Sequence, residues 1–305
     1  MKTHLPQIHQ EILRVYQRNL CQVRGLSPST CRQRFRDVRL FLQAAAVRQI
    51  GDLSQLGPTR LVNYLSAQST HCQPASLRNI ASSVRDFLRI ARQQGWTSGF
   101  QELGVPKIAC GARNDLPVYL SAPQLDSLLT GWDRNTPGGA RDLAISLCLA
   151  KLGLQASEVA ELVLEAINWR QATVCLERSK NSGQVQLPLL AEVGEAIADY
   201  LRTGRSSCAH RQVFVFHQPA RPMSAQAVSA VIRRGLRRCG IELPRAGAHL
   251  LRHTLASHLV QNGASLKEVA DVLRHRALNS ASVYAHVDLP NLRLLAQPWP
   301  QEVRP

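Results

Sequence analysis

The sequence lacks the features that mark membrane-spanning and secreted proteins. No run of about 18 apolar residues occurs in its 305 residues, so we expect no membrane span and no membrane partner. The first residues, Met1–Leu5, lack the apolar core of a signal peptide. We therefore expect the protein to act in the cytoplasm. A chain of this length favours two domains.

Cysteine is present but is not arranged for disulfides or for a metal. The eight cysteines are dispersed, and no two of them form a Cys-x-x-Cys pair. In a chain this long, that pattern indicates free thiols in a reducing compartment. Cys208 and His210 form a two-ligand fragment, whereas structural zinc needs four ligands, so we expect no metal site.

Lysine is scarce, and arginine dominates the charge. Only five of the 37 basic side chains are lysine, against 21 acidic ones, so the net charge is +16 and the isoelectric point is about 10.3. Residues 1–103 carry 14 basic and 5 acidic side chains, and residues 104–305 carry 23 and 16, so both parts are basic. The planar fork of arginine matches phosphate. The charge therefore favours a nucleic-acid partner over a solvated basic surface, which would repel itself.

Residues 1–103 are predicted to form an all-helical DNA-binding domain. Ser27, followed by proline, is a favoured helix N-cap, and glycines mark the ends of two helices. On the helix that Ser27 starts, Arg32, Arg36 and Arg39 fall near one face. Candidate DNA contacts in this domain are Arg32, Arg36, Arg39 and Arg85. The expected helices span residues 7–24, 28–46, 58–67 and 74–94.

The rest of the chain is predicted to be a linker and a helical domain that carries a small β-hairpin. Residues 104–117 hold proline and glycine without a helical period, so they form the linker, and residues 118–305 form the second domain. Two β-rich stretches, 173–176 and 185–187, are separated by a turn and indicate a hairpin. Further expected elements are helices at 122–130, 141–152, 224–239 and 249–262, a helix after the capping box Ser265–Glu268, and a strand at 213–216. The predicted fold class is mainly α with a small β-sheet.

Four features with chemical potential follow one another in this domain. Lys180 lies at the tip of the predicted hairpin. His249 and Arg252 are three residues apart, so both project from one helix face. His275 ends the helix that the capping box starts, and Tyr284 follows nine residues later. Each feature alone is weak, because His-x-x-Arg is common by chance and a tyrosine is more often a core residue than a nucleophile.

The order and spacing of these residues resemble the catalytic half of the tyrosine recombinase, or phage integrase, family. Ala248–Thr254 resembles the family's His-x-Leu-Arg-His motif. Leu273–His275 with Tyr284 resembles its Leu-Gly-His and downstream tyrosine, and Lys180 with Leu187–Leu189 resembles its hairpin lysine and the strand that follows.

Other stretches extend the resemblance to nearly the whole chain. Gly25–Thr30 resembles the start of the family's N-terminal DNA-clamping, or core-binding, domain. The stretch Gly263–Glu268 and the tail 288–300 resemble recombinases encoded in trios on bacterial mobile elements. The resemblance implies a core-binding domain followed by a catalytic domain, and DNA integration or transposition at the nucleoid of a bacterial cell.

The resemblance implies a defined chemistry. Tyr284 would attack a DNA phosphodiester, keep the 3′-phosphate and release a 5′-hydroxyl. Arg252 and His275 would bind the negative charge that develops on the phosphate oxygens. Lys180 would donate a proton to the leaving oxygen, and His249 would assist as acid or base. Because a phosphotyrosine keeps the bond energy and arginines bind the phosphate, we expect no ATP, no other cofactor and no metal.

The implied partner is double-stranded DNA with specific recombination sites. Arg274 and Arg276 flank His275 and add candidate DNA contacts. The family assembles as tetramers on DNA, so we expect a homo- or hetero-oligomer in which the apolar tail 288–300 docks onto a neighbouring subunit. The alternative is that the tail packs on its own domain. His253 and His258 are interpreted as core or helix-packing residues.

The sequence departs from the family pattern at three places near the site, of which one is Ser280-Ala281, where the family commonly has a threonine pair. The family's Thr-Gly-Leu-Arg-x-Ser-Glu-Leu corresponds to Leu152–Val159, with Gln155 in the position of the first catalytic arginine. Glutamine brings no charge and no fork, so this loss should cost on the order of 10²–10³ in rate. Gln155 is either an engineered change or a natural one, and Lys151 is a candidate substitute. Arg274 replaces the usual glycine before His275, which adds either a phosphate contact or a steric problem.

These departures leave more than one function open. One is an active site-specific recombinase whose rate is lowered by Gln155. Another is a catalytically impaired or accessory subunit that recognises recombination sites and shapes the synapse without cutting. A basic transcriptional regulator is a weaker third alternative.

Overall fold

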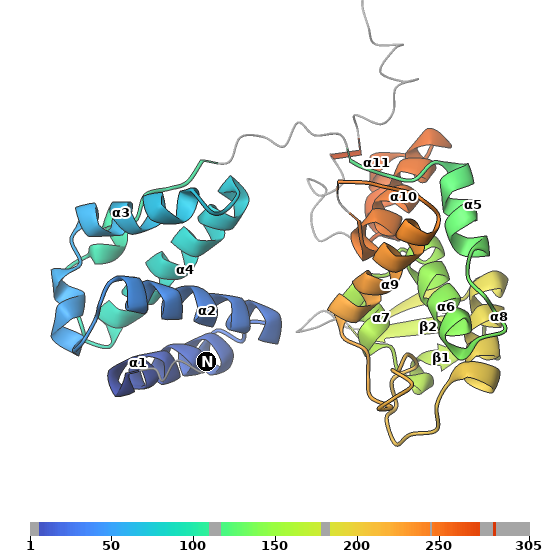
Figure 1. The fold of residues 1–305 in the computed structure, drawn as a ribbon, viewed down its shortest axis with the longest axis horizontal. Coiled ribbons are helices and arrows are strands. Elements are labelled where there is room, and N and C mark those ends of the chain that lie inside the picture. Colours follow the sequence, from blue (N-terminus) through green and yellow to red (C-terminus); the bar gives the residue numbers. More distant parts are fainter. Residues whose placement is uncertain (1–5, 110–116, 178–183, 245, 275–282, 285–305) are drawn as a thin grey trace, which may run out of the picture. The chain divides into compact units, whose positions relative to one another are not determined.

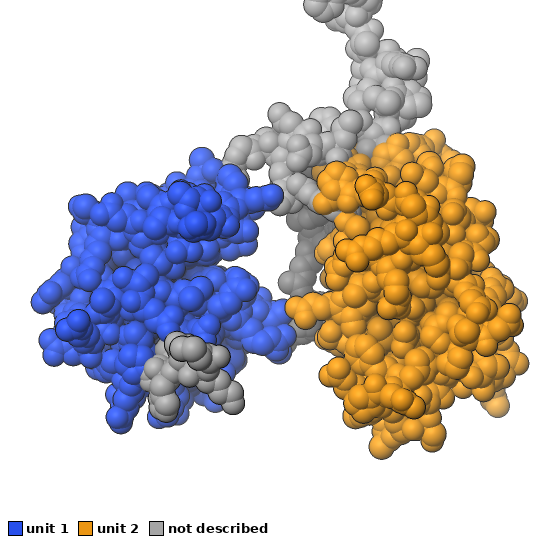
Figure 2. Space-filling view, in the orientation of Figure 1, with its two compact units in different colours: residues 1–114 blue, residues 115–305 orange. Residues whose placement is uncertain are grey.

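The computed structural model describes residues 6–109, 117–177, 184–244, 246–274 and 283–284 (Figure 1). The chain divides into two compact units, residues 1–114 and residues 115–305, which carry different colours in Figure 2. The predicted linker, 104–117, includes this division.

Unit 1 is helical, as the sequence predicts. Its α-helices are α1 (Gln7–Arg18), α2 (Pro28–Ala44), α3 (Pro58–Ser69) and α4 (Pro74–Gln93), with a π-helical turn at Asn19–Val23 and 3-10 turns at Ile50–Gln55 and Gln101–Gly104. Three of the four α-helices begin with a proline at the first position, where no backbone donor is needed. Ser27 also accepts a hydrogen bond from the Thr30 amide at 3.3 Å, so the predicted N-cap of α2 is confirmed.

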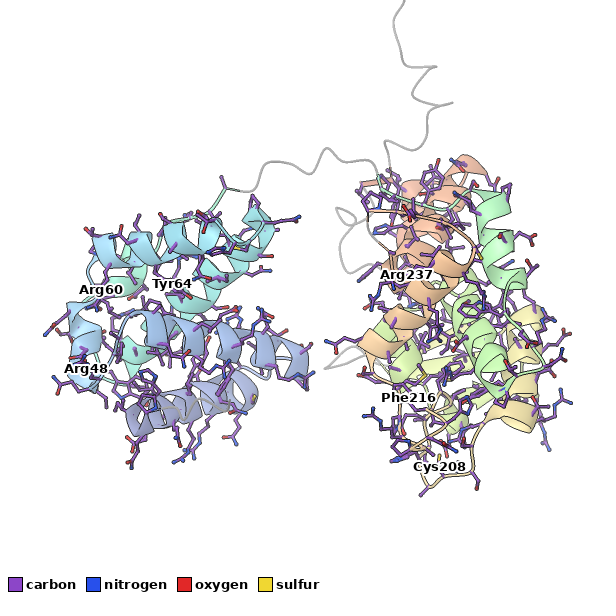
Figure 3. All side chains as sticks on the ribbon, in the orientation of Figure 1. Arg48, Arg60, Tyr64, Cys208, Phe216 and Arg237 are labelled. Atoms are coloured by element: carbon purple, nitrogen blue, oxygen red, sulfur yellow. The ribbon has the colours of Figure 1, made fainter. Side chains whose placement is uncertain are left out.

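Aromatic rings join the helices of unit 1 in its core. Tyr16 of α1 and Phe87 of α4 are fully buried and meet edge to face, with ring centroids 5.6 Å apart. Phe41 of α2 contacts Phe87 at 6.3 Å and Tyr64 of α3 at 5.1 Å, so one chain of rings links all four helices. Figure 3 labels Tyr64 beside Arg60, whose Nη2 donates to the Ala45 carbonyl at 2.8 Å.

A buried carboxylate organises the charges of unit 1. Asp86 of α4 is 6% exposed and forms ion pairs with Arg24 and Arg34 from the chain around α2, while Arg89 approaches its other oxygen at 3.7 Å. A buried charge is tolerated when it is paired in this way. Part of the positive charge of unit 1 is therefore used inside the fold.

Unit 2 surrounds a small sheet with helices. Its elements are α5 (Ala122–Thr130), α6 (Pro137–Lys151), α7 (Ala156–Glu161), β1 (Ile167–Asn168), β2 (Thr173–Glu177), β3 (Gln184–Pro188), α8 (Ala191–Asp199), α9 (Ala225–Arg238), α10 (Ala248–Gln261) and α11 (Leu266–Val272), with a 3-10 turn at Leu164–Ala166 and a π-helical turn at Tyr200–Gly204. The strands pair antiparallel in the order β1-β2-β3, with Cys175 opposite Gln186. α6 is buried along nearly its whole length and packs against α8 and α10. The sheet lies at one end of the unit and α11 at the other (Figure 1).

The predicted hairpin and the predicted helix starts of unit 2 are confirmed. Ser121, Ser224 and Ser265 each cap a helix, and Ser265 with Glu268 forms the full capping box. The turn between β2 and β3 lies outside the described residues. The sequence did not indicate β1, α7 or α8, because a two-residue strand and short helices leave little periodicity to read.

The predicted strand at 213–216 is wrong. Gln212 and Val215 form only isolated bridges, with Val163 and Pro222, and no ladder follows. Val213, Phe214 and Val215 are nevertheless completely buried. The run of apolar residues therefore marks a buried connection, in which side chains pack on all sides without strand pairing.

The described part of the chain contains no helix that is long and apolar enough to span a bilayer. The same residues contain no group of three or more potential metal ligands. In the described ranges, the free thiols include Cys21, Cys72, Cys148, Cys175, Cys208 and Cys239.

The ion pairs of Asp86 are expected to stabilise unit 1 against unfolding. Asp86→Asn removes the charge but keeps the shape, so Arg24 and Arg34 lose their shared counter-ion in a partly dry site. We expect the free energy of unfolding of unit 1 to fall by about 2–3 kcal/mol. Urea unfolding of the full chain, followed by circular dichroism, measures this loss. The control is Arg78→Ala, which removes an exposed arginine of the same helix, α4, and should change the midpoint little. Equal midpoints for both variants would contradict the assignment.

Candidate active site

Tyr284 lies against the helix that carries the His-x-x-Arg pair. Its hydroxyl oxygen is 2.7 Å from Nδ1 of His253, and the two ring centroids are 5.6 Å apart. The tyrosine is 2% exposed and packs in a small core with Val260 of α10 and Val269 of α11. Although the phenol is largely buried, its hydroxyl has a polar partner on α10.

Burial changes the acidity of this phenol. Desolvation raises the pKa of Tyr284 to about 12, and the positive charge of Arg252 opposes the shift without cancelling it. The hydroxyl is therefore protonated at neutral pH in the DNA-free protein. Attack on an electrophile then requires another group to accept the proton or more positive charge to stabilise the phenolate.

Two histidines line the same side of α10. His249 is exposed and its ring centroid is 6.3 Å from that of His253, one helical turn further on. His258 packs as expected: its Nε2 lies 3.0 Å from the Leu120 carbonyl. His253 does more than pack, because it is the residue that contacts the Tyr284 hydroxyl. The signal in the sequence was its spacing of four from His249.

Arg252 is a buried cation that connects three segments. It is 6% exposed, and its guanidinium donates to the backbone carbonyls of Gly153 and Leu273. Gly153 lies between α6 and α7, and Leu273 follows α11. Burial, and then the charge of Arg274, lower the pKa of Arg252, while Glu158 opposes the shift. Such a site favours an anionic ligand.

Gln155 is used at the start of α7. It is exposed, and its backbone amide donates to Glu158 at 2.7 Å in a reciprocal capping box. Lys151, the candidate substitute for the missing arginine, is paired elsewhere: its Nζ lies 2.9 Å from Glu192. Neither side chain places a free positive charge beside Arg252.

Arg274 occupies the position of the family glycine with a positive φ of 56°. Glycine adopts this conformation without steric penalty, whereas another residue there costs about 1 kcal/mol or more. Its side chain is 7% exposed, and its Nη2 lies 2.8 Å from Glu158 and 3.2 Å from the Gly153 carbonyl. The sequence raised the possibility of a steric clash at this position. Arg274 instead adopts a left-handed backbone conformation, and its side chain points into the fold.

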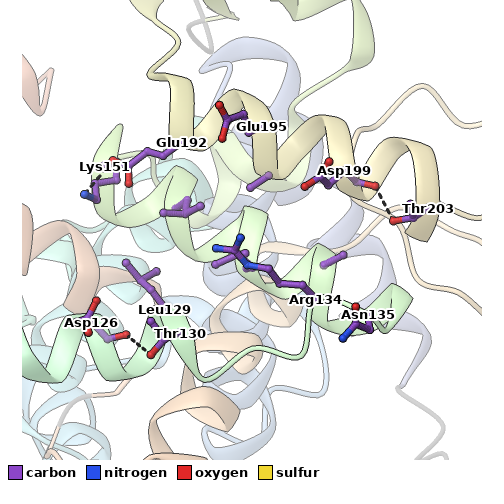
Figure 4. A pocket seen from close by; sticks show the side chains of 14 residues that line it. Asp126, Leu129, Thr130, Arg134, Asn135, Lys151, Glu192, Glu195, Asp199 and Thr203 are labelled. Carbon is purple, nitrogen blue, oxygen red and sulfur yellow. Dashed lines mark hydrogen bonds and ion pairs between the residues drawn. The ribbon is translucent and has the colours of Figure 1, made fainter.

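A cleft of about 500 Å³ lies between α5, α6 and α8 (Figure 4). Its polar lining includes Asp126, Arg134, Lys151, Glu192, Glu195 and Asp199. The cleft contains Lys151 but none of the predicted catalytic residues. Its acidic rim is unsuited to a phosphate.

The remaining predicted site residues fall into two groups. Lys180, His275 and Arg276 lie outside the described residues, as does the tail. In unit 1, Arg32 and Arg36 are exposed, whereas Arg39 is half-buried. Arg85 donates to the carbonyls of Val105 and Pro106 at 3.2 and 3.0 Å, so it has partners within its own unit. A DNA contact by these arginines stays a prediction.

The described residues combine a nucleophile of the right type with an anion site. The buried Tyr284 hydroxyl contacts a histidine that can accept its proton, and the desolvated guanidinium of Arg252, on the same helix, is near enough for its charge to oppose the rise in the pKa of the phenol. Such an arrangement can transfer a phosphoryl or acyl group to the tyrosine oxygen.

Two family models match the sequence. Residues 119–289 match the phage integrase family, and residues 13–95 match the phage integrase N-terminal SAM-like domain. A candidate integrase/recombinase of Sinorhizobium fredii, y4rA, is 36% identical over 99% of this chain and 74% of its own length. The tyrosine recombinase XerC of Oceanobacillus iheyensis is 26% identical, with 88% of this chain and 89% of its own length covered.

Solved structures share the fold. The XerH site-specific recombinase, in a post-cleavage complex with palindromic difH substrate, superposes with a TM-score of 0.69 at 15% identity, covering 98% of each chain. A dimer of λ integrase residues 75–356, bound to a COC′ core site, gives 0.68 at 17% identity, with 97% and 99% covered. Both the helical first unit and the helix-and-sheet second unit therefore have counterparts in these proteins, and the chain belongs to the phage integrase family of tyrosine recombinases.

Proposed function

We propose that this recombinase cuts and rejoins DNA at specific sites through a 3′-phosphotyrosine on Tyr284. The observation that carries the proposal is the position of the Tyr284 hydroxyl, 2.7 Å from His253 on the helix of His249 and Arg252. The hydroxyls of the buried Tyr16 and Tyr200 contact backbone carbonyls, whereas that of Tyr284 contacts an imidazole, which can accept its proton.

The reaction exchanges one phosphate ester for another. The Tyr284 oxygen attacks phosphorus, the bond to the 5′-oxygen breaks, and the 3′-phosphate stays on tyrosine. The phenol loses a proton and the leaving oxygen gains one, so charge and atoms balance without ATP. Lys180 is the expected donor to the leaving oxygen, with His249 as a further acid or base and His275 as a phosphate contact.

His253 is proposed to accept the phenolic proton. In the tautomer with an unprotonated Nδ1, this nitrogen accepts a hydrogen bond from the tyrosine hydroxyl at the observed distance. The accepted proton forms an imidazolium next to the new ester, where its charge opposes that of the phosphate. In the reverse reaction, the protonated Nδ1 returns the same proton to the tyrosine oxygen.

DNA and an assembled complex are the proposed partners. The XerH and λ integrase structures are complexes with DNA, which supports a duplex ligand for both units here. We expect a tetramer on DNA, of this chain alone or with sister recombinases, in which residues 288–300 dock onto a neighbouring subunit. Binding to recombination sites would place the protein at the nucleoid.

A non-cutting accessory subunit is the second candidate function. The observation that favours it is Gln155, which is exposed and engaged in capping α7 where the family has an arginine. Such a subunit would still bind DNA with a strong salt dependence, because phosphate contacts release counterions.

A nicked suicide substrate tests the nucleophile. The full chain should form a covalent protein–DNA adduct that resists denaturing gel electrophoresis, and Tyr284→Phe should form none, because it lacks the attacking oxygen. The matched control is Tyr119→Phe in the same unit, whose hydroxyl accepts from Gln261 at 2.9 Å and should be dispensable. Site-specific binding without any adduct by the parent chain would favour the accessory function.

The pH dependence of the adduct rate tests His253. Burial raises the pKa of Tyr284 to about 12. In the variant His253→Gln, which lacks the proton acceptor, the Tyr284 hydroxyl should therefore ionise too rarely to react well near neutral pH. We expect its rate to be about 10²–10⁴-fold below that of the parent at pH 7.5. It should then rise about tenfold per pH unit between pH 7 and 9, as free phenolate becomes more abundant.

The control for this pH profile is His258→Gln, on the same helix. The parent and the control should both show a shallower rise, because a positioned base removes the need for free phenolate. A His253→Gln profile parallel to that of the parent would mean that another group accepts the proton.

A further inference from the structure

Two of the departures from the family pattern lie on neighbouring segments of the fold. Gln155 lacks the expected guanidinium, and Arg274 adds one where the family has glycine. These residues are 119 positions apart in the sequence. In the fold, Arg274 Nη2 lies 3.2 Å from the Gly153 carbonyl, which belongs to the same loop as Gln155. Relative to the family pattern, an arginine is therefore missing at position 155 and another is present at position 274, whose side chain reaches the same loop.

Arg274 shares its acceptor with Arg252. Both guanidinium groups donate to the Gly153 oxygen, so the two cations are neighbours. The contact is not a loose surface encounter, because the Arg274 side chain is 7% exposed and Arg252 is 6% exposed. Like charges this close repel each other in a dry site. The Glu158 carboxylate, 2.8 Å from Arg274 Nη2, offsets one of the two charges, and a bound anion would offset the other.

The hydrogen bonds of Arg274 orient the group but do not saturate it. Nη2 binds Glu158 at 2.8 Å, and Nη1 lies 3.4 Å from the Leu152 carbonyl and 3.3 Å from that of Val272. Nε is buried and has no hydrogen-bond partner among the described residues. A donor that is buried without a partner is uncommon, and a ligand is one way to satisfy it.

Other sources of charge for this loop are engaged elsewhere. The ammonium of Lys151 is paired with Glu192 on the side of α6 that lines the cleft in Figure 4. The Gln155 side chain accepts from the first turn of α7. Among the described residues of this loop and its contacts, Arg274 is the cation that lies beside Arg252.

We propose that Arg274 supplies the second guanidinium of the phosphate site, in place of the arginine that is missing at position 155, and that with Arg252 it binds the scissile DNA phosphodiester. The inference rests on the proposed function and deepens it. The positive charge reaches the phosphate from the end of α11 instead of from the loop before α7. Gln155 is then no sign of an impaired subunit, because its partner substitution restores the charge.

A double-mutant cycle at positions 155 and 274 tests the exchange. The rate of adduct formation on the suicide substrate, at saturating DNA, should fall about 10²–10³-fold in Arg274→Gly. In the double variant Gln155→Arg, Arg274→Gly, which restores the family pattern, it should lie within about tenfold of the parent. The two substitutions should therefore be strongly non-additive.

Two features of the design separate chemistry from folding. Glycine accepts the positive φ at position 274, but Arg274→Gly also loses the ion pair with Glu158, so the adduct rates of all variants are compared at saturating DNA and well below the thermal midpoint of each variant. Millimolar methylguanidinium should restore part of the adduct rate of Arg274→Gly, because it replaces the lost charge. A purely structural arginine would give no such rescue. The control for net charge is Arg237→Ala, which removes an exposed arginine of α9 (Figure 3) without placing a glycine in a helix.

Distinct outcomes overturn the inference and the proposed function. If Arg274→Gly reacts as fast as the parent, or loses the same factor with arginine at 155 as with glutamine, Arg274 is no substitute. If the parent forms no adduct but Gln155→Arg does, the inference fails while the nucleophile stands. If the parent, Gln155→Arg and the double variant all form none, the proposed function itself fails.

Discussion

Arg252 is a cation with almost no contact with water. Backbone carbonyls take the place of its hydration shell, and these hydrogen bonds hold the surrounding segments in position. The carbonyls of Gly153 and Leu273 accept from it, so the loop after α6 and the end of α11 are both held against α10. Desolvating a guanidinium is expensive, and neutral carbonyls compensate only part of the cost. The fold therefore holds a poorly solvated positive charge at this position. Such a charge favours the binding of a phosphate but is unfavourable for stability alone.

The local rules of the chain could be read from the sequence because they involve few residues. The N-caps at Ser27, Ser121, Ser224 and Ser265 each depend on a hydrogen bond three residues away, and all four are present. The β2–β3 hairpin follows from alternation and a turn. The stretch 213–216 was misjudged because complete burial favours the same β-branched and aromatic residues as strand pairing does.

The site could be predicted only in part, for a different physical reason. The spacing of His249 and Arg252 places them on one face whatever the rest of the chain does. The partner of Tyr284 depends instead on how residue 284 returns to α10, and no local pattern encodes that contact with His253. The approach of Arg274 to Gly153 is likewise tertiary, and it depends on a left-handed backbone at a position where the family pattern gave only an absence of glycine.

Net charge is also a weaker guide to DNA contact than the composition suggests. Arg24 and Arg34 are bound to Asp86 in unit 1, and Arg141 and Arg234 are bound to Asp142 in unit 2. These cations stabilise carboxylates that are themselves almost completely buried, so part of the formal charge of +16 is neutralised inside the fold. The arginines that face solvent, together with those that no buried acid neutralises, set the electrostatic attraction for a polyanion.

The balance of charges also matters at the proposed phosphate site. In the proposed reaction, a phosphodiester would cancel the charge of one guanidinium and the pentavalent transition state would add a second negative charge, so Arg252 alone would leave the site net negative. Arg274 would add a second positive charge, of which its ion pair with Glu158 at 2.8 Å already neutralises a part. The rest would act on the phosphate more strongly than the charge of an exposed arginine does, because the side chain beside the Gly153 carbonyl is screened little by water.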